Sequence, residues 1–416
     1  MKWYIETYGC TANKSDESLI RGVLLSHHHE PVEDIHQADV LIIVTCTVIG
    51  TTEQRMVSRF RFFKKTKKPV IVTGCMSAVQ QALITEILPD AFLLKPSELS
   101  TIVDIVSGNK TTTQENNTSW LPARYTSQYA PITIAEGCLQ KCSYCITRLA
   151  RGSLHSYPKQ HIIAYIQEAL RQGCTEIQLT AQDTAAYGYD LNSSLDELVG
   201  TIPQKPNCFR IRIGMMNPYT VRKRFSNILA CYRHPNVYRF IHLPVQAGDN
   251  MILQKMNRQY TVEEFREMVT TFRAKIPDIS LSTDVIVGFP TETDDQFHHT
   301  CTFLKNIKPD IVNITRFSAR PNTPAKTMSG RIPTKVIKQR SQYLSELCKQ
   351  LQRTKNKKFH GKKYTVLITE LGKNNTFFGR TDTYKPVVLH EQVHLGEFVS
   401  VQIIDSSEIN LFGKLI

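Results

Sequence analysis

The chain has 416 residues, more than one hydrophobic core usually organises, so we expect two or three domains. An apolar fraction of 41% and a charged fraction of 21% are typical of a soluble globular protein, and no run of about 18 apolar residues predicts a membrane span. The N-terminus lacks the order of a signal peptide, so we expect a cytoplasmic protein without membrane contact. In that reducing compartment the eleven cysteines favour metal ligation or catalysis over disulfides.

The first part of the chain, residues 1–106, alternates apolar runs with amphipathic stretches. We predict strands over residues 2–8, 40–45 and 69–73, and helices over residues 16–27, 52–65 and 78–88. This rhythm is typical of an α/β domain with a parallel sheet. Each predicted strand ends at a cysteine, which is Cys10, Cys46 or Cys75. Ligand sites of open parallel sheets lie beyond the carboxyl ends of the strands, so these three cysteines can converge.

Residues 107–130 are rich in Thr, Asn, Ser and Gln and predict a linker. Strand-like and helical runs alternate again in a second domain, residues 131–357. Its predicted strands are residues 132–135, 176–180, 209–214, 238–243, 280–287 and 311–317, with helices such as residues 159–172, 262–275 and 293–306 between some of them. Six parallel strands predict a partial (β/α)6 barrel, with its chemistry in the loops at the carboxyl ends of the strands.

The net charge of +14 is concentrated in two segments. Residues 331–363 carry eleven Lys and Arg against the single acid Glu346, and residues 55–68 carry seven cations and no acid. The seven are Arg55, Arg59, Arg61, Lys64, Lys65, Lys67 and Lys68. Clustered cations most often meet a phosphate backbone, although solvated helix faces are the simpler alternative.

The last segment, residues 358–416, breaks into short β-type runs after a basic helix predicted over residues 334–355. The runs are residues 364–369, 376–380, 386–389, 398–404 and 411–416. At this length the pattern predicts a small β-barrel, a shape that often binds nucleic acid.

Three cysteines lie close together directly after the first predicted strand of the barrel: Cys138, Cys142 and Cys145. Iron-sulfur clusters are held by thiolates, and three ligands leave one iron of a four-iron cluster open to a substrate or cofactor. The alternatives are buried thiols, or a zinc site that a distant residue completes, although zinc normally takes four protein ligands. The convergent trio Cys10, Cys46 and Cys75 is read as a second ligand set. The other five, Cys174, Cys208, Cys231, Cys301 and Cys348, show no shared pattern.

With these residues the chain resembles, over essentially its full length, the radical S-adenosylmethionine methylthiotransferases of the MiaB/MtaB/RimO family. The resemblance implies a [4Fe-4S] cluster on Cys138, Cys142 and Cys145 that binds S-adenosylmethionine, and an auxiliary [4Fe-4S] cluster on Cys10, Cys46 and Cys75. It also implies that the C-terminal barrel is a TRAM domain, which binds RNA. The matching motifs at residues 182–183, 212–218, 242–248 and 288–290 imply an S-adenosylmethionine pocket lined by Gln182, Arg212, Asn217 and Gln246. For Arg212 and Gln246, hydrogen bonding within the barrel is the alternative.

Residues 44–48, 134–138 and 150–154 look most like the MtaB branch. That likeness implies a transferase that converts N6-threonylcarbamoyladenosine beside the anticodon of tRNA to its 2-methylthio derivative. A 5'-deoxyadenosyl radical made from S-adenosylmethionine is implied to remove the hydrogen from C2. The implied partners are the tRNA anticodon loop and an electron donor such as ferredoxin or flavodoxin, and the sulfur donor stays open.

Alternatives remain for the substrate and for the class of protein. The same chemistry can act on a ribosomal protein or on isopentenyladenosine in tRNA, and a non-catalytic iron-sulfur sensor that binds RNA is the alternative without catalysis. Three loop residues also depart from the family pattern. Ala247 replaces a frequent serine, whereas Thr291 and Asn322 replace common glycines, which leaves the shape of those loops open.

Overall fold

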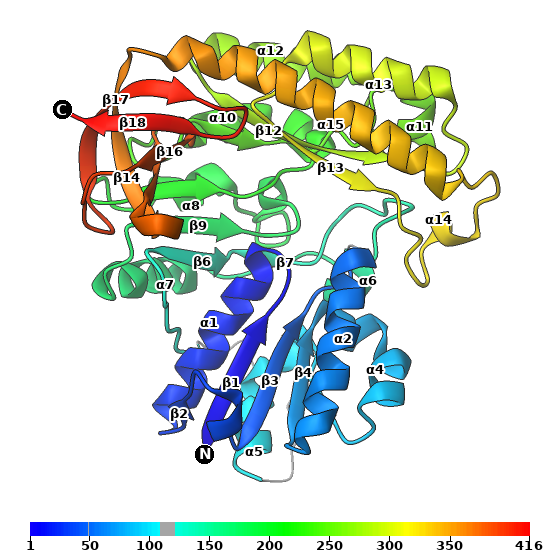
Figure 1. The fold of residues 1–416 in the computed structure, drawn as a ribbon, viewed down its shortest axis with the longest axis vertical. Helices are drawn as coiled ribbons and strands as arrows, with labels where there is room; N and C mark the ends of the chain where they lie inside the picture. Colours follow the sequence, from blue (N-terminus) through cyan, green and yellow to red (C-terminus); the bar gives the residue numbers. More distant parts are fainter. Residues whose placement is uncertain (49, 109–120) are drawn as a thin grey trace.

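The computed structural model describes residues 1–48, 50–108 and 121–416, which form three parts (Figure 1). The N-terminal part lies at the bottom of the view, an incomplete barrel lies above it, and a small β-barrel lies at the upper left. Within these described ranges, no helix has the length and apolar character needed to cross a membrane.

Five parallel strands form the sheet of the N-terminal part in the order β2-β1-β3-β4-β5. They are β1 (Lys2–Thr7), β2 (Glu30–Pro31), β3 (Val40–Thr45), β4 (Val70–Gly74) and β5 (Phe92–Leu93). The central strand β3 is buried throughout, because its apolar side chains contribute to a core on each face of the sheet. One core includes α1 (Thr11–Ser26) and α5 (Ile102–Val106), the other includes α2 (Gly50–Thr66) and α4 (Gln81–Ile87), and α3 (Cys75–Val79) directly follows β4.

The second part is an incomplete barrel of six parallel strands, in which β6-β9-β10 and β11-β12-β13 are joined by a bridge between Ile211 and Val237. The strands are β6 (Tyr129–Thr133), β9 (Glu176–Thr180), β10 (Arg210–Ile213), β11 (Phe240–His242), β12 (Ser280–Val287) and β13 (Ile311–Arg316). The helices are α6 (Thr147–Arg151), α7 (Lys159–Arg171), α8 (Leu195–Gly200), α9 (Pro218–Lys223), α10 (Phe225–Cys231), α11 (Asn250–Lys255), α12 (Val262–Lys275), α13 (Asp294–Ile307) and α14 (Pro324–Thr327). A short pair, β7 (Ala135–Glu136) and β8 (His155–Ser156), flanks the cysteine loop.

Alternation along the strands gives this barrel a polar interior. Ile177, Ile211 and Ile241, on β9, β10 and β11, belong to the core shared with the outer helices. Their neighbours along each strand therefore face the barrel interior. The inward residues include Glu176, Gln178, Arg212, Phe240, His242, Asp284 and Asn313. This interior can accept a polar ligand.

The long helix α15 (Thr334–Asn356) packs beside β13 and leads into the C-terminal part. That part is a closed barrel in the order β14-β15-β16-β18-β17. Its strands are β14 (Lys363–Leu371), β15 (Phe377–Thr381), β16 (Pro386–Leu389), β17 (Phe398–Ser406) and β18 (Leu411–Leu415). The core at its centre contains Val366, Val387, Val401 and Leu411.

Two contacts fasten the C-terminal barrel to the incomplete barrel. In the β15–β16 turn, the Tyr384 ring lies 4.8 Å from those of Tyr238 and Phe240, and its hydroxyl lies 3.3 Å from Glu176 Oε1. The second contact is a buried group of charges: Asp310 Oδ1 lies 2.9 Å from Lys385 Nζ, and Asp310 Oδ2 lies 2.5 Å from Nζ of Lys355 on α15.

The predicted fold class is confirmed, and the predicted strands over residues 40–45, 176–180, 280–287 and 386–389 coincide with β3, β9, β12 and β16. The helix predicted over residues 16–27 begins earlier, at Thr11, and the one over residues 78–88 is divided at Gln80. The strand predicted over residues 132–135 begins at Tyr129 and ends at Thr133. Of the predicted linker, residues 109–120 lie outside the described residues, and the backbone N–H of Arg124 donates to the carbonyl oxygen of Ser18 on α1.

Candidate active site

One group of thiols lies at the carboxyl ends of three neighbouring strands, β1, β3 and β4. Its members are Cys10, Cys46 and Cys75. Glycines allow the strand ends to approach closely. A Cβ on Gly74, whose φ is +92°, would lie 2.4 Å from the carbonyl oxygen of Thr45, and a Cβ on Gly9, whose φ is +121°, would lie 2.8 Å from Cys46 Cβ. Neighbouring strands are about 4.8 Å apart, so their ends can bring three thiols around one ligand.

The buried side chain of Asn13 lies between these strand ends. Its Nδ2 donates hydrogen bonds of 2.7 Å to the carbonyl oxygens of Tyr8 and Thr45. Its Oδ1 lies 4.0 Å from the sulfurs of both Cys10 and Cys75. The predicted convergence of these two cysteines is therefore present in the structure.

The second group of thiols, Cys138, Cys142 and Cys145, lies in the loop between β7 and α6. The turn after α11 holds this loop. Asn257 Nδ2 donates to the carbonyl oxygen of Lys141 at 2.7 Å, and Arg258 Nη1 donates to the Cys142 sulfur at 3.4 Å. Arg258 also donates to the carbonyl oxygen of Pro244, which follows β11. These contacts fix the loop at the carboxyl end of the barrel.

Burial affects the protonation of three of these thiols. Burial raises the pKa of both Cys75 and Cys138 to about 12, and it also raises the pKa of Cys145. Metal ligation requires thiolates, so binding a cluster must release protons. Among the described residues, no three His, Cys, Asp or Glu side chains form a site for a single metal ion. Two groups of three thiols have the donor chemistry of iron-sulfur sites, and the assignment of individual ligands remains a prediction.

The four residues predicted to line the cofactor pocket all lie in or after barrel strands. Gln182 follows β9, Gln246 follows β11 with a left-handed φ of 71°, and Asn217 uses its side chain to cap α9 by accepting from the N–H of Tyr219. Arg212 lies inside the barrel over the rings of Phe240 and Tyr384.

Two buried polar atoms of these four residues, Gln182 Oε1 and Arg212 Nε, have no hydrogen-bond partner among the described residues. Unpaired buried polar atoms are rare, so a polar ligand fits here.

Sequence reasoning missed a polar chain in the barrel interior. His242 Nε2 lies 2.8 Å from Asp284 Oδ1, and Asn313 Nδ2 donates to the same oxygen at 2.8 Å. Burial would raise the pKa of Asp284, but His242 and Asn313 hold it below its usual range. The motif that contains His242 was visible in the sequence. Asp284 and Asn313 are marked only by inward positions on β12 and β13.

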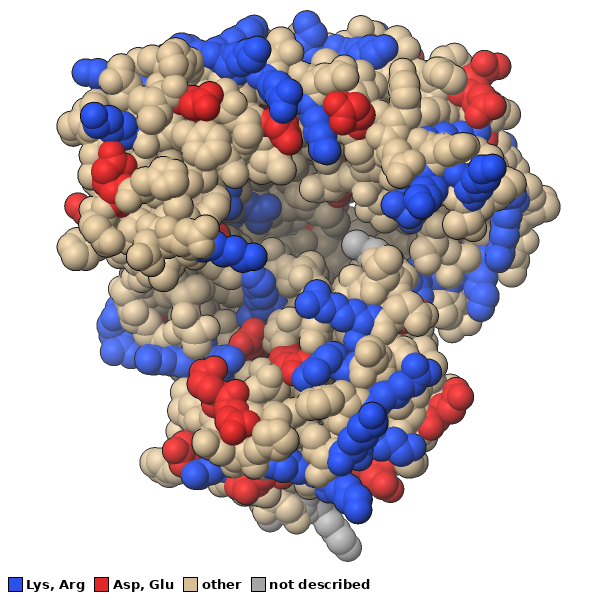
Figure 2. All heavy atoms as spheres, viewed as in Figure 1, with Lys and Arg blue, Asp and Glu red and all other residues tan. Residues whose placement is uncertain are grey.

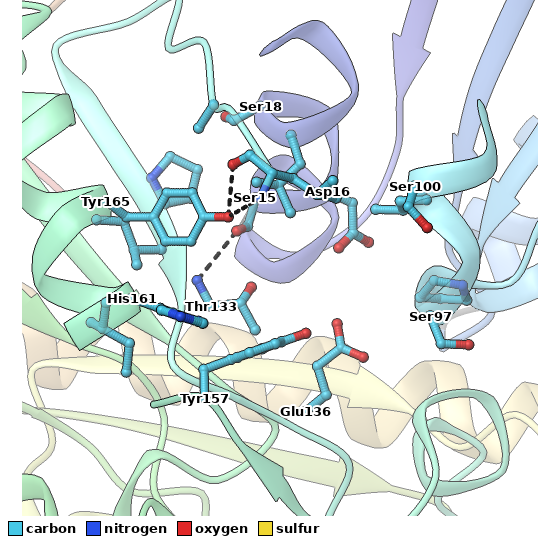
Figure 3. Close-up of a pocket in the computed structure, with 18 of the residues that line it drawn as sticks. Ser15, Asp16, Ser18, Ser97, Ser100, Thr133, Glu136, Tyr157, His161 and Tyr165 are labelled. Carbon is cyan, nitrogen blue, oxygen red and sulfur yellow. Dashed lines mark hydrogen bonds between the residues drawn. The ribbon is translucent and has the colours of Figure 1, made fainter. Parts of the chain in front are cut away.

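A hollow lies between the N-terminal part and the incomplete barrel, with Lys and Arg side chains on several sides (Figure 2). A smaller pocket of about 100 Å³ lies at the contact of α1 with β6 and α7 (Figure 3). Ser15 accepts a hydrogen bond from the N–H of Thr133 there, and Asp16 and Glu136 also line this pocket.

A parallel six-stranded barrel with three cysteines after its first strand defines an enzyme of the radical S-adenosylmethionine class. The sequence matches Uncharacterized protein family UPF0004 over residues 2–94, the Radical SAM superfamily over residues 132–304 and the TRAM domain over residues 357–416. The chain belongs to the MiaB family of radical S-adenosylmethionine methylthiotransferases.

Full-length relatives establish this membership. A probable threonylcarbamoyladenosine tRNA methylthiotransferase of Archaeoglobus fulgidus is 39% identical, with 100% of this chain and 99% of the relative covered. The tRNA-2-methylthio-N(6)-dimethylallyladenosine synthase of Aquifex aeolicus is 32% identical over 100% and 98%. The radical S-adenosylmethionine methyltransferase TsrM of Kitasatospora setae shares the fold, with a TM-score of 0.57, 14% identity, and coverage of 78% of this chain and 74% of that one.

Proposed function

We propose that the chain adds a methylthio group to C2 of N6-threonylcarbamoyladenosine beside the anticodon of tRNA. The observation that carries the proposal is the pair of thiol groups on the two sides of one domain contact, Cys10, Cys46 and Cys75 on one side and Cys138, Cys142 and Cys145 on the other. Relatives of 37–39% identity over the full length, named for threonylcarbamoyladenosine in tRNA, support this substrate.

The groups that the site would hold supply chemistry that protein side chains lack. A [4Fe-4S] cluster on Cys138, Cys142 and Cys145 with S-adenosylmethionine supplies one-electron chemistry for the unactivated C2–H bond, and a second cluster on the N-terminal thiols supplies a site for sulfur. Arg258 orients Cys142 by donating to its sulfur. Gln182, Arg212, Asn217 and Gln246 line the S-adenosylmethionine pocket in this proposal.

The barrel interior is suited to a polar nucleoside. The chain of His242, Asp284 and Asn313 offers hydrogen-bonding groups to the threonylcarbamoyl substituent. The adenine must leave its stack to enter, which single-stranded anticodon loops permit at low cost. Ferredoxin or flavodoxin would supply electrons, and the sulfur donor is open.

Helix α2 supports an RNA partner. Arg59 pairs with Glu6, and Lys68 donates to the carbonyl oxygens of residues 35, 36 and 38, so these two cations have structural partners. The five others have no ion-pair partner among the described residues and are exposed. They are Arg55, Arg61, Lys64 and Lys65 on α2 and Lys67 just after it. The cations over α2, in the right half of the N-terminal part, lie below the hollow (Figure 2). Such cations can neutralise RNA phosphates.

A second candidate substrate is isopentenyladenosine in tRNA, which the 32% identical relative from Aquifex aeolicus favours. The two substrates differ in the N6 substituent, because the threonylcarbamoyl group carries a carboxylate and the isopentenyl group is apolar. A polar interior favours the first.

The test is an anaerobic reaction of the reconstituted chain with S-adenosylmethionine, a reductant, sulfide and tRNA that carries either nucleoside. Mass spectrometry of the digested tRNA should find the 2-methylthio derivative of N6-threonylcarbamoyladenosine, and Cys142→Ala should abolish both this product and 5'-deoxyadenosine. If product forms only from isopentenyladenosine, that nucleoside is the substrate instead of N6-threonylcarbamoyladenosine. If the parent chain forms no 5'-deoxyadenosine, the proposed radical reaction is wrong.

A further inference from the structure

The short helix α6 (Thr147–Arg151) connects the two thiol groups. Burial raises the pKa of the Cys145 thiol, and the backbone N–H groups of Thr147 and Arg148 at the start of α6 oppose this shift. The Arg148 guanidinium donates to the carbonyl oxygen of Cys138. On the other side, α6 packs against α3, whose first residue is Cys75. One helix of five residues therefore contacts both candidate sites.

The last residue of α6, Arg151, crosses from the barrel into the N-terminal part. Its side chain is fully buried, with 0% of its surface exposed. Nη2 donates to Asp16 Oδ2 and to Asn13 Oδ1 at 3.2 Å, and Nη1 donates to Glu136 Oε1 at 3.0 Å. Asp16 and Glu136 face each other across the contact of α1 with the barrel (Figure 3). Arg151 thus joins α1 to β7 in the interior.

Arg151 also reaches the environment of the N-terminal thiols. Burial raises the pKa of the Cys75 thiol, and the positive charge of Arg151 opposes this shift. Asn13 Oδ1, which accepts from Arg151, lies 4.0 Å from the sulfurs of Cys10 and Cys75. Meanwhile Arg151 Nε is buried and has no hydrogen-bond partner in the described residues. A buried donor without a partner is rare and fits an acceptor bound at this site.

We propose that Arg151 is a positioning residue for the group held by Cys10, Cys46 and Cys75. From the barrel domain it directs a positive charge and N–H donors at the ligand sulfurs, and through Asp16 and Asn13 it fixes this thiol group relative to Cys138, Cys142 and Cys145. The inference rests on the proposed function only in that the N-terminal thiols hold an iron-sulfur cluster. Hydrogen bonds to cluster sulfurs are one of the means by which a protein sets the reduction potential.

Lysine cannot replace arginine in this position. The planar guanidinium presents five N–H donors in a fixed fork, whereas a lysine ammonium is a point charge on a flexible stem. The Arg151 guanidinium donates hydrogen bonds to Asp16, Asn13 and Glu136 at the same time. Arg151→Lys therefore keeps the charge and removes the geometry, which makes it the informative variant.

The experiment uses the full chain with Cys138→Ala, Cys142→Ala and Cys145→Ala, so that only the N-terminal site can carry a cluster. After anaerobic reconstitution, iron content, the EPR spectrum and the midpoint potential are measured with and without Arg151→Lys. We expect about four irons per chain in both. We expect the variant to show altered g-values and a more negative midpoint potential, because fewer donors stabilise the reduced cluster. The exposed Arg171, which pairs with Glu168 on α7, supplies the control variant Arg171→Lys, which should match the parent.

Asp16→Asn is the second variant, because it weakens the anchor of Arg151 and retains the arginine. It should shift the potential in the same direction by a smaller amount. With all cysteines present, Arg151→Lys should keep 5'-deoxyadenosine formation and lose about 10- to 100-fold in methylthio product, the usual effect of removing a partner of a metal ligand. Bound iron with unchanged g-values and potential in both variants would overturn the role of Arg151. If the variant with the three Cys→Ala changes and the native Arg151 binds no iron, the N-terminal thiols hold no cluster, and the proposed function is overturned instead.

Discussion

Two residues in loops whose shape the sequence leaves open adopt the backbone conformation that glycine favours. Thr291 has a φ of 69° and Asn322 has a φ of 58°. The loops therefore have the shape expected for glycine, with a side chain added. The left-handed region disfavours residues with a Cβ by about 1–2 kcal/mol, and it disfavours β-branched Thr more than Asn, whose side chain tolerates it.

Replacing Thr291 by glycine should therefore stabilise the chain. We expect Thr291→Gly to raise the free energy of unfolding by about 1 kcal/mol, since relief of the strain exceeds the loss of a half-buried side chain and its exposed hydrogen bond from Lys255 Nζ to Oγ1. Differential scanning calorimetry of the metal-free chain measures the change in Tm. Asn322→Gly is the matched control and should change Tm less. A lower Tm for Thr291→Gly would contradict this account of the loop.

At the residue scale, the sequence points to the six cysteines but not to the side chains that contact them. Spacing and strand ends singled out six cysteines without any structure. Arg151 and Arg258 were missed, because Asp16 lies 135 positions from Arg151 and Cys142 lies 116 positions from Arg258. The sequence does not distinguish a buried arginine from a solvated one. Only the fold shows which carboxylate or sulfur the guanidinium contacts.

At the element scale, hydrophobic periodicity predicted strands well and the start of α1 poorly. Residues 11–15 show no apolar periodicity, so the helix was predicted from residue 16. In the structure, Asn13 and Ser15 are buried by contacts with Tyr8, Thr45 and the N–H of Thr133. Tertiary contacts within the N-terminal part and with the barrel, which no local pattern encodes, thus extend the helix over polar residues.

Helix α2 allows a direct test of RNA binding. We expect the triple variant Arg61→Ala, Lys64→Ala, Lys65→Ala to weaken binding of an anticodon stem-loop RNA, because fewer phosphates are neutralised. The slope of log K against log salt should fall by about 0.7 to 0.9 for each phosphate that is no longer neutralised. Fluorescence anisotropy at several salt concentrations measures both quantities.

The control for this test removes cations from the outer helices of the barrel. Lys275→Ala on α12 and Lys305→Ala on α13 change exposed cations of helices that lie at the top of the molecule (Figure 1), above the hollow (Figure 2). These variants should bind RNA like the parent. Equal salt slopes for the triple variant and the parent would show that α2 is only a solvated face.

At the scale of the whole molecule, part of the basic segment of residues 331–363 has a structural role. Arg340 pairs with Glu292 and Asp294, and Lys355 pairs with Asp310. Charge counting cannot distinguish these from cations available to RNA. The structure therefore reduces the predicted phosphate-binding surface of α15.

The buried carboxylate Asp310 predicts how stability depends on pH. Burial would raise its pKa, but Lys385 and Lys355 together hold it below its usual range. Its contribution to stability is therefore complete above the ordinary Asp pKa of about 3.9 and is lost as pH falls through the lower folded value. Asp310→Asn should lower stability by about 3 kcal/mol at pH 7, because two lysines lose their charged partner.

The same variant should also flatten the fall of Tm below about pH 4, since one titrating group is removed. Thermal unfolding between pH 3 and pH 7 measures this, with the exposed Asp90→Asn as control. A profile for Asp310→Asn that runs parallel to that of the parent would argue against a lowered pKa for this carboxylate.

Tyr384 brings the C-terminal barrel into contact with residues inside the incomplete barrel. Its ring packs on Tyr238 and Phe240 and lies beside Arg212, so a side chain of the C-terminal barrel covers the end of the incomplete barrel at which its strands begin. The two domains are consequently not interchangeable building blocks. A grafted RNA-binding domain without an aromatic residue at this turn would leave Tyr238, Phe240 and Arg212 uncovered at that end of the barrel.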